Sequence, residues 1–269
     1  MVRKNFLLNN PRMVNSIVCF IDILGFTEMI KTKCKNGEGN ELLSRLYNSL
    51  NRSYELINIT LAFENTKIFT DNIIISCPIQ GNGEKELSSV LYSLLWYQYQ
   101  LTLEGFFIRG GVSVGDNYMD ENIVFGPALI DAYEAESKLA NSPRIILDKK
   151  CTELHEKINK QYLLSGLYSE YAKYLEVGGD DGILFVNYLS LYKNFPSNDI
   201  CNCIYDLEKH KCRIVENLEF FKREEDDPQK ELKRIKIRDK YLWVAEYHNN
   251  FCKENYKNEK NLHIKIEIY

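Results

Sequence analysis

The chain has 269 residues, 45% of them hydrophobic, and a formal net charge of −4 at pH 7. This composition is sufficient for one large domain, or for one domain with an extension, and the acidic balance argues against a nucleic-acid-binding surface. No apolar run approaches the roughly 20 residues of a membrane helix. The apolar stretch at the N-terminus is too short for a signal peptide. We therefore expect a cytoplasmic protein, in which a local basic pocket for phosphate is still compatible with the net charge.

The eight cysteines and four histidines form no recognisable metal-binding pattern. Only Cys201 and Cys203 are close in sequence, and a C-x-C pair alone is a weak zinc signal. Cys19 and Cys77 lie in apolar strand patterns, which predicts buried thiols. We do not expect a structural zinc site, because no set of four ligands is apparent.

The first predicted element is a buried strand over residues 16–23, which runs into the segment Phe-Ile-Asp-Ile-Leu-Gly-Phe-Thr at residues 20–27. A short apolar run before a glycine-containing turn is typical of such a strand. A carboxylate at its end, here Asp22, is costly unless something compensates its charge. Backbone amides at the Gly25 turn can converge on an anion, so an acid beside them suits a divalent metal that holds a phosphate chain. The alternative is a solvated strand-end aspartate.

The order of the next elements predicts the fold class. A helix should follow Gly25 and end near the loop at 35–39, and apolar spacing predicts a second helix at about 40–57. Residues 59–77 predict a hairpin with a second acid, Asp71, at its tip. Then follow a helix at 85–103, a strand at 106–115, a short strand near 122–126, a helix at 128–140 and a strand at 143–147. This order is that of a ferredoxin-like palm, an α+β sandwich with helices covering one face of an antiparallel sheet.

The remainder of the chain predicts one more hairpin and a helical extension. The turn within residues 176–190 is acidic and could be a metal site, but Asp-Gly is also a standard hairpin signal, which we favour. Beyond Asn194 the pattern becomes helical, with a charged break at 222–228. Within 231–251 the apolar residues in helical register are Leu232, Ile235, Leu242, Val244, Tyr247 and Phe251. We predict a main domain at 12–190 and a C-terminal helical extension at 191–269, which could cover the domain's open face or contact another protomer.

Four segments in this order resemble the class III nucleotidyl cyclases. They are residues 20–27, the hairpin at 67–76, the strand Arg109-Gly-Gly-Val-Ser-Val-Gly115 and the helix start Gly126-Pro-Ala-Leu-Ile-Asp-Ala-Tyr-Glu134. The family carries F-x-D-I-x-G-F-T, a G-D hairpin, R-x-G-I-x-x-G and W-G-x-x-V-N-x-A-x-R in these places. The resemblance covers about residues 15–190, and its first motif is the most specific. It implies that the main domain is the catalytic domain of a nucleotidyl cyclase, a phosphorus–oxygen lyase.

The resemblance implies a role for each matched residue. Asp22 and Asp71 would hold two divalent ions, Mg²⁺ or Mn²⁺, with the backbone carbonyl of Ile23 as a further ligand. One metal would activate the ribose 3′-hydroxyl and the other would clamp the triphosphate. Two such metals suit an in-line displacement, because each neutralises charge on the attacking or the departing oxygen. The amides for phosphate would come from Gly25, Phe26 and Thr27.

The chain departs from the family where the transition state is stabilised. The family's helix-start Asn and Arg would fall at Ile130 and Glu134, and the glycine-rich loop at 177–182 has no lysine. A phosphoryl transfer without a cation beyond its metals loses much of its transition-state stabilisation. Either another residue compensates or the domain is inactive. The candidate cations, in order, are Arg109, Lys138 and Arg144; for the first, the alternative is a strand arginine paired within the sheet.

The positions that select the base are half present. In adenylyl cyclases a Lys four residues before the hairpin acid and an Asp three before the helix-start Gly read adenine; here these are Lys67 and Ile123. Guanylyl cyclases have Glu at the first position, which Lys67 contradicts. The segments 109–115 and 126–136, and the tail at 240–249, look more like the pyrimidine cyclases of bacterial Pycsar anti-phage systems. Those enzymes make cyclic UMP or cyclic CMP for a separately encoded effector.

The resemblance therefore implies a metal-dependent cyclase that converts UTP or CTP into the 3′,5′-cyclic monophosphate and pyrophosphate in anti-phage defence. An adenylyl cyclase and a catalytically silent nucleotide-binding module are the alternatives. The family forms its sites at the seam of two cyclase domains, and this chain has room for one. We therefore expect a head-to-tail homodimer in which Arg109 reaches across the seam, and neither a nucleic-acid partner nor a membrane span.

Overall fold

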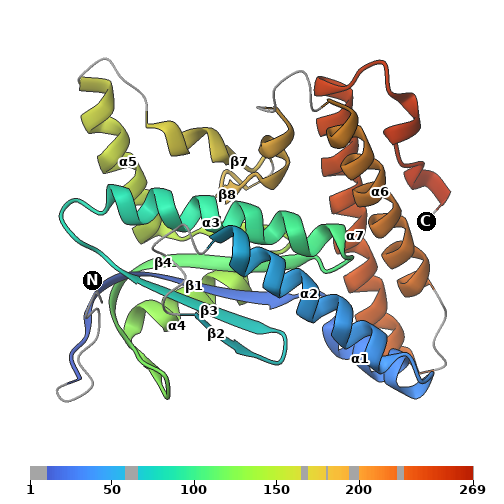
Figure 1. The fold of residues 1–269 in the computed structure, drawn as a ribbon, viewed down its shortest axis with the longest axis horizontal. Helices are drawn as coiled ribbons and strands as arrows, with labels where there is room; N and C mark the ends of the chain where they lie inside the picture. Colours follow the sequence, from blue (N-terminus) through green and yellow to red (C-terminus); the bar gives the residue numbers. More distant parts are fainter. Residues whose placement is uncertain are drawn as a thin grey trace.

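The strand predicted around Asp22 is central to a mixed sheet in the computed structural model. The structure describes residues 11–57, 66–164, 169–179, 181–193, 200–222 and 227–268. Within these ranges the strand order is β2-β3-β1-β4-β6-β8-β7, with β5 paired to β4 (Figure 1). Only β4 and β6 pair in parallel. The strands are β1 (Val14–Ile23), β2 (Thr66–Phe69), β3 (Asn72–Pro78), β4 (Ile108–Met119), β5 (Val124–Phe125), β6 (Ile145–Leu147), β7 (Leu175–Val177) and β8 (Leu184–Val186). The predicted α+β fold class is confirmed.

The helices follow the predicted order along the chain, except for α5, which was not predicted. They are α1 (Phe26–Lys35), α2 (Gly39–Ile57), α3 (Glu84–Leu103), α4 (Pro127–Glu134), α5 (Lys149–Leu164), α6 (Ile200–Lys222) and α7 (Pro228–Asn255). Short helical turns lie at η1 (Ala135–Leu139), η2 (Glu170–Tyr174), η3 (Tyr188–Lys193), η5 (Lys260–Leu262) and η6 (Ile266–Ile268). The first part of the predicted hairpin, residues 58–65, lies outside the described residues, as does Asp180 of the last hairpin.

Strand β1 is apolar from Ile17 to Ile21 because both faces of this stretch are covered. Successive side chains of a strand point to opposite faces. Ile17, Cys19 and Ile21 pack with α3 in the main core, whereas Val18 and Phe20 pack against α4. The expectation that helices cover one face of the sheet is therefore wrong. The opposite face carries α4, which contacts β1 and β4.

The predicted helix at 128–140 is in fact α4 followed by the π-helical turn η1. Gly111 on β4 allows this close packing, because a Cβ there would lie 2.3 Å from the carbonyl oxygen of Ala132 and 2.8 Å from the backbone nitrogen of Glu136. A π turn widens the helix locally, and such turns are frequent at functional sites. Here the turn carries Glu136 onto the sheet beside Arg109.

Helices α6 and α7 pack against each other and into the rest of the fold. Leu207 on α6 and Phe251 on α7 belong to the main core. A second apolar cluster joins Phe221 on α6 and Tyr241 on α7 to Leu24, in the turn after β1. In Figure 1 the two helices stand beside the end of the sheet where β1 finishes. The C-terminal segment therefore covers the end of β1 that carries Asp22.

The apolar face predicted for α7 is only partly right. Val244 and Phe251 are buried, but Leu232 is 55% exposed. The residues that face the core include Ile237, Tyr241 and the polar His248. A hydrophobic pattern missed this face because part of it is formed by polar groups that are satisfied by hydrogen bonds.

A buried chain of hydrogen bonds fixes the joint between α6, α7 and the C-terminal tail. His248 Nε2 lies 2.9 Å from the carbonyl oxygen of Leu262, so this nitrogen carries the proton. His248 Nδ1 then accepts from His210 Nδ1, 2.9 Å away, and His210 Nε2 accepts from the Tyr188 hydroxyl at 2.8 Å. With both imidazoles neutral, every donor in this chain of bonds has an acceptor.

This chain of bonds predicts acid sensitivity. Burial lowers the pKa of both histidines below the ordinary 6.5, that of His248 to about 4. The unfolded chain then binds protons that the folded chain does not, so the free energy of unfolding should fall as pH drops from about 6.5 toward 4. Each histidine contributes about 1.4 kcal/mol per pH unit over that interval. Urea denaturation at pH 7.5 and pH 5.5 measures the difference.

The matched variants are His248→Gln, which keeps a donor for the Leu262 carbonyl, and His263→Gln outside the buried chain. We expect the first to reduce the loss of stability between the two pH values and the second to leave it unchanged. Identical pH dependence of wild type and His248→Gln would contradict the assignment of these histidines.

Candidate active site

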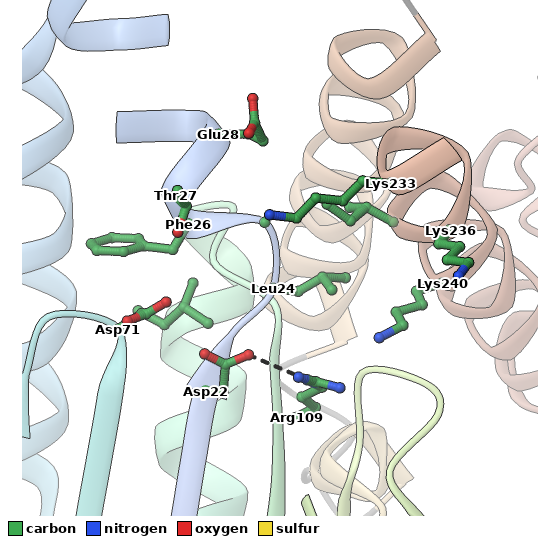
Figure 2. Close-up of a pocket in the computed structure, with 13 residues that line it drawn as sticks. Asp22, Leu24, Phe26, Thr27, Glu28, Asp71, Arg109, Lys233, Lys236 and Lys240 are labelled. Carbon is green, nitrogen blue, oxygen red and sulfur yellow. Dashed lines mark hydrogen bonds and ion pairs between the residues drawn. The ribbon is translucent and has the colours of Figure 1, made fainter. Parts of the chain in front are cut away.

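The end of β1 opens into a pocket with a volume of about 290 Å³. Its walls come from the end of β1 and the start of α1, from the β2–β3 turn, from β4 and from α7 (Figure 2). The residues that line it are Asp22, Ile23, Leu24, Gly25, Phe26, Thr27, Glu28, Asp71, Arg109, Lys233, Lys236, Ile237 and Lys240. The pocket thus gathers the predicted site residues, except Lys67, from segments that are far apart in sequence.

Asp22 and Arg109 are direct cross-strand partners on β1 and β4. Opposite residues of an antiparallel pair project from the same face. Arg109 Nε lies 3.2 Å from Asp22 Oδ2 and 2.6 Å from Glu136 Oε1. Its N–H donates to Asp22, whereas Glu136 Oε1 has no hydrogen-bond donor among the described residues. One guanidinium therefore sits between two carboxylates, of which the side chain of Glu136 is only 3% exposed.

This arrangement leaves more negative charge than Arg109 neutralises. Burial raises the pKa of Asp22, and the neighbouring Asp71 raises it further, while Arg109 opposes both effects. Burial likewise raises the pKa of Glu136, against the opposing charge of Arg109. A carboxylate cluster with raised pKa values gains stability from an added cation.

Asp71 is fixed to the end of β1 by its backbone. Its carbonyl oxygen accepts the N–H of Ile23 at 3.2 Å. Its Oδ1 accepts from Thr70 Oγ1 at 2.7 Å and from Asn72 Nδ2 at 3.2 Å. Figure 2 shows Asp71 and Asp22 together at the floor of the pocket. The predicted pairing of these two acids in one place is what the structure shows.

The turn after β1 presents the start of α1 to the same pocket. Gly25 has φ 73°, a left-handed conformation that favours glycine. A Cβ at this position would also lie 2.5 Å from the ring of Phe221 on α6. Phe26 is buried in the core and Thr27 is exposed, so Phe26 can offer a ligand only its backbone. The first N–H groups of a helix have no intrahelical acceptor and attract anions.

Lys67 lies outside this pocket. It is opposite Ile74 on β3, which is itself opposite Phe20, so its side chain projects from the same face of the sheet as Asp22. Hydrogen bonds from the N–H groups of Ile123 and Asn122 are the main cause of the lowered pKa of Asp120. The positive charge of Lys67 lowers this pKa further. The two positions predicted to read the base therefore lie near one exposed carboxylate.

Of the three candidate cations, Arg109 alone lines the pocket. Lys138 pairs with Glu134 at 3.0 Å on the surface. Arg144 pairs with Asp181 and packs over the rings of Phe185 and Trp243, where it lines a second pocket.

Arg109 contacts Asp22 of its own chain, and its expected reach across a dimer seam stays a prediction. The β1–β4 register, which pairs Asp22 with Arg109, fixes this geometry.

The sequence analysis missed the cations on α7. Lys233, Lys236 and Lys240 line the pocket from a segment that we assigned to an extension. Their i, i+3, i+7 spacing places them on one face of a helix, and this signal was present in the sequence. What the sequence lacks is any indication that this face meets Asp22.

The donor set fits a hard divalent cation. No group of three or more His, Cys, Asp and Glu side chains that could hold a metal is found in the described part of the chain. Two carboxylates beside an open volume nonetheless suit Mg²⁺ or Mn²⁺, which keep several waters and take further oxygens from phosphates. Asp22 and Asp71 would hold such an ion, and the backbone of Ile23 also lines the pocket.

Comparisons with known proteins give partial likenesses. No protein-family model matches the chain, and no curated protein does. Among solved structures, the chain is similar to a bacterial light-regulated adenylyl cyclase, with a TM-score of 0.41 and 17% identity over 54% of this chain and 46% of that one. It is also similar to a class III adenylyl cyclase-like ATP-binding protein from Pseudomonas aeruginosa, with a TM-score of 0.41 and 14% identity over 53% of this chain and 35% of that one.

The chain thus spans less than half the length of either neighbour. Because both likenesses are partial, we base the proposed function on the site residues of this chain. Among the helices described, none has the length and apolar character to cross a membrane.

The geometry of the acids predicts metal binding that does not depend on any activity. We expect Asp71→Asn to weaken Mn²⁺ binding at least about tenfold, because it removes one of two charged ligands. Mn²⁺ titration followed by electron paramagnetic resonance measures the affinity. Asp120→Asn is the matched control, since this acid is also in a turn after a strand but outside the pocket. Equal Mn²⁺ affinity of Asp71→Asn and wild type would show that the hairpin acid is not a ligand.

Proposed function

We propose that this protein is a metal-dependent nucleotidyl cyclase of the class III type, which converts UTP or CTP into the 3′,5′-cyclic monophosphate and pyrophosphate. The observation that carries the proposal is the meeting of Asp22 and Asp71 beside the start of α1 in one pocket. Asp22 pairs with Arg109, but burial and the negative charge of Asp71 raise the pKa of Asp22 by more than this one cation offsets.

The chain's own residues divide the work of binding. Asp22 and Asp71 hold the metals, with the Ile23 carbonyl as a further ligand. The backbone of Gly25, Phe26 and Thr27 binds phosphate oxygens. When bound, two divalent ions would supply charge neutralisation at the attacking and departing oxygens. Arg109 has a second ion-pair partner, Glu136, 2.6 Å from its Nε, so it can leave Asp22 to a metal and still keep one ion pair.

The choice of a pyrimidine rests on the sequence resemblance and on the surroundings of Lys67. A lysine at the first base-contacting position, with Ile123 at the second, lacks the adenine-reading carboxylate in its usual place. Asp120 lies in the same turn and accepts the N–H of Ile123 at 2.8 Å. Lys67 and Asp120 together offer a donor and an acceptor for a base edge.

A homodimer is part of the proposal, because the face of the sheet that carries Asp22 also exposes apolar side chains. Phe69 is 77% exposed and projects with Lys67 from this face. Ile130 and Tyr133, on the helix that covers it, are also largely exposed. A second copy that covers these side chains would remove them from water. Signalling to a separate effector in anti-phage defence, in the cytoplasm, is proposed from the resemblance of segments 109–115 and 126–136.

Incubation of the purified protein with each of the four NTPs and Mn²⁺, followed by mass spectrometry of the products, tests the proposal. Cyclic UMP or cyclic CMP supports it, and cyclic AMP alone would identify an adenylyl cyclase. The absence of any cyclic product would favour a silent nucleotide-binding module. Two observations favour that second candidate. Arg109 already donates a hydrogen bond to Asp22, the expected metal ligand. Ile130 and Glu134 stand where the family motif has Asn and Arg.

We expect Asp71→Ala to lower turnover roughly a thousandfold or more, because loss of a metal ligand costs several kcal/mol in the barrier. Its melting temperature should stay near that of the wild type, since a turn acid contributes little to the core. Initial rates and thermal denaturation of the same preparations give both values. Near-normal turnover in Asp71→Ala would refute the two-metal assignment.

We expect Lys67→Ala to change which NTP is preferred, or to raise KM more than it lowers kcat, because a base contact acts mainly through binding. The measurement is kcat and KM for all four NTPs. Lys85→Ala, an exposed lysine at the start of α3, is the control. A uniform loss for every NTP would instead assign Lys67 to the phosphates or to the structure.

A further inference from the structure

We propose that α7 supplies the cations that bind the phosphate chain of the substrate, through Lys236 and Lys240. This inference rests on the proposed function, because it assigns the phosphate-binding residues of the same pocket. It makes the C-terminal helices a wall of the site in place of the lysine that the loop at 177–182 lacks.

The first support is the position of these lysines. Lys236 and Lys240 lie one turn apart on α7 and line the pocket opposite Asp22 and Asp71. In Figure 2 the ammonium group of Lys240 lies above Arg109 and that of Lys233 beside the turn at Phe26, whereas that of Lys236 lies farther from the two acids. Lys236 lines the second pocket as well as the first. A phosphate chain that reaches from the acids toward α7 would meet these lysines.

The second support is the charge around them. No ion pair is formed by Lys233, Lys236 or Lys240 within the described residues. Lys240 is partly buried and close enough to Arg109 for their charges to repel, with Asp22 and Glu136 as the opposing attraction. Both of these acids already contact Arg109. An ammonium group in this setting is stabilised by a further anion.

The third support is the rigidity of the helix that carries them. Ile237 and Tyr241, the residues that follow Lys236 and Lys240, are buried in the cluster with Leu24. Tyr241 stacks on Phe221 and packs edge-on against Phe107. The backbone that carries the lysines is therefore already ordered, and binding a ligand orders only their side chains, which lowers the entropic cost of binding.

The fourth support is the shape of the space. Lys236 and Lys240 also line the second pocket, whose volume is about 930 Å³ and whose walls include Arg144, Phe185 and Trp243. The first pocket alone lies at the lower limit of small-molecule sites, which are about 300–1,000 Å³. A nucleoside triphosphate is larger than a metal with a few oxygens, so it must extend past the first pocket. The two lysines stand at the boundary between the pockets.

Lysine suits this task chemically. An ammonium group is a compact point charge with three donors on a flexible stem, and it follows the oxygens of a phosphate chain without a fixed fork geometry. The ligand class that fits is a polyphosphate ester with a bound divalent cation, since the acids across the pocket favour the cation.

The test uses inorganic tripolyphosphate as the probe, titrated into the full-length protein by calorimetry with Mg²⁺ present. We expect the double variant Lys236→Gln/Lys240→Gln to bind at least about tenfold more weakly than wild type, because it loses two charge-assisted contacts. Lys253→Gln, an exposed lysine on the same helix, should bind like wild type. Lys236→Arg/Lys240→Arg keeps the charges and should retain most of the affinity. Thermal denaturation of each variant confirms folding.

Undiminished tripolyphosphate binding by the folded double Gln variant would overturn the inference, as would an equal loss in Lys253→Gln. The outcome is separable from the proposed function. If no NTP yields a cyclic product but the double variant loses tripolyphosphate binding, the phosphate site stands and the cyclase proposal fails. If wild type produces a cyclic nucleotide and the double variant keeps its KM and kcat, the cyclase stands and this inference fails.

Discussion

The structure depends on a charged pair placed where two apolar strands run side by side. Asp22 and Arg109 face each other across β1 and β4, where β1 ends. Their side chains are only 21% and 22% exposed, so each charge is stabilised by its partner. The pair therefore fixes the polar end of β1, and Glu136 extends it. The turn at Gly25, the β2–β3 hairpin and α7 all meet at this polar end.

The sequence predicted the sheet end well because local rules govern it. An apolar run, a glycine turn and an acid define β1 and the Gly25 turn with no information from elsewhere in the chain. The hairpin tip at Asp71 follows from turn chemistry in the same way. The π turn at Glu136 was not predicted, because its cause is the contact of the helix with Gly111, and no local propensity favours it.

The lysines of α7 that line the pocket were not predicted, for a different reason. Lys236 lies more than two hundred residues from Asp22, and only tertiary packing brings them together. Tyr241 and Phe221 set the face that α7 turns to the core, and the hydrophobic pattern, which included the exposed Leu232, predicted this face only in part. The amino-acid composition carries no information on where charged residues gather in the folded chain. A net charge of −4 describes the surface as a whole and says nothing of a basic strip beside an acidic pocket floor.

The separation of charge within the pocket limits what it can bind. Acids gather at the floor, where Asp22 and Asp71 lie, and the lysines of α7 stand on the other side, with Arg109 between them (Figure 2). A free divalent cation complements the floor but is repelled by Lys236 and its neighbours. A free polyphosphate complements the lysines but is repelled by the acids. A metal–polyphosphate complex matches both ends at once, so each component improves the binding of the other. Such coupling is reciprocal, and it selects the complex over either ion alone.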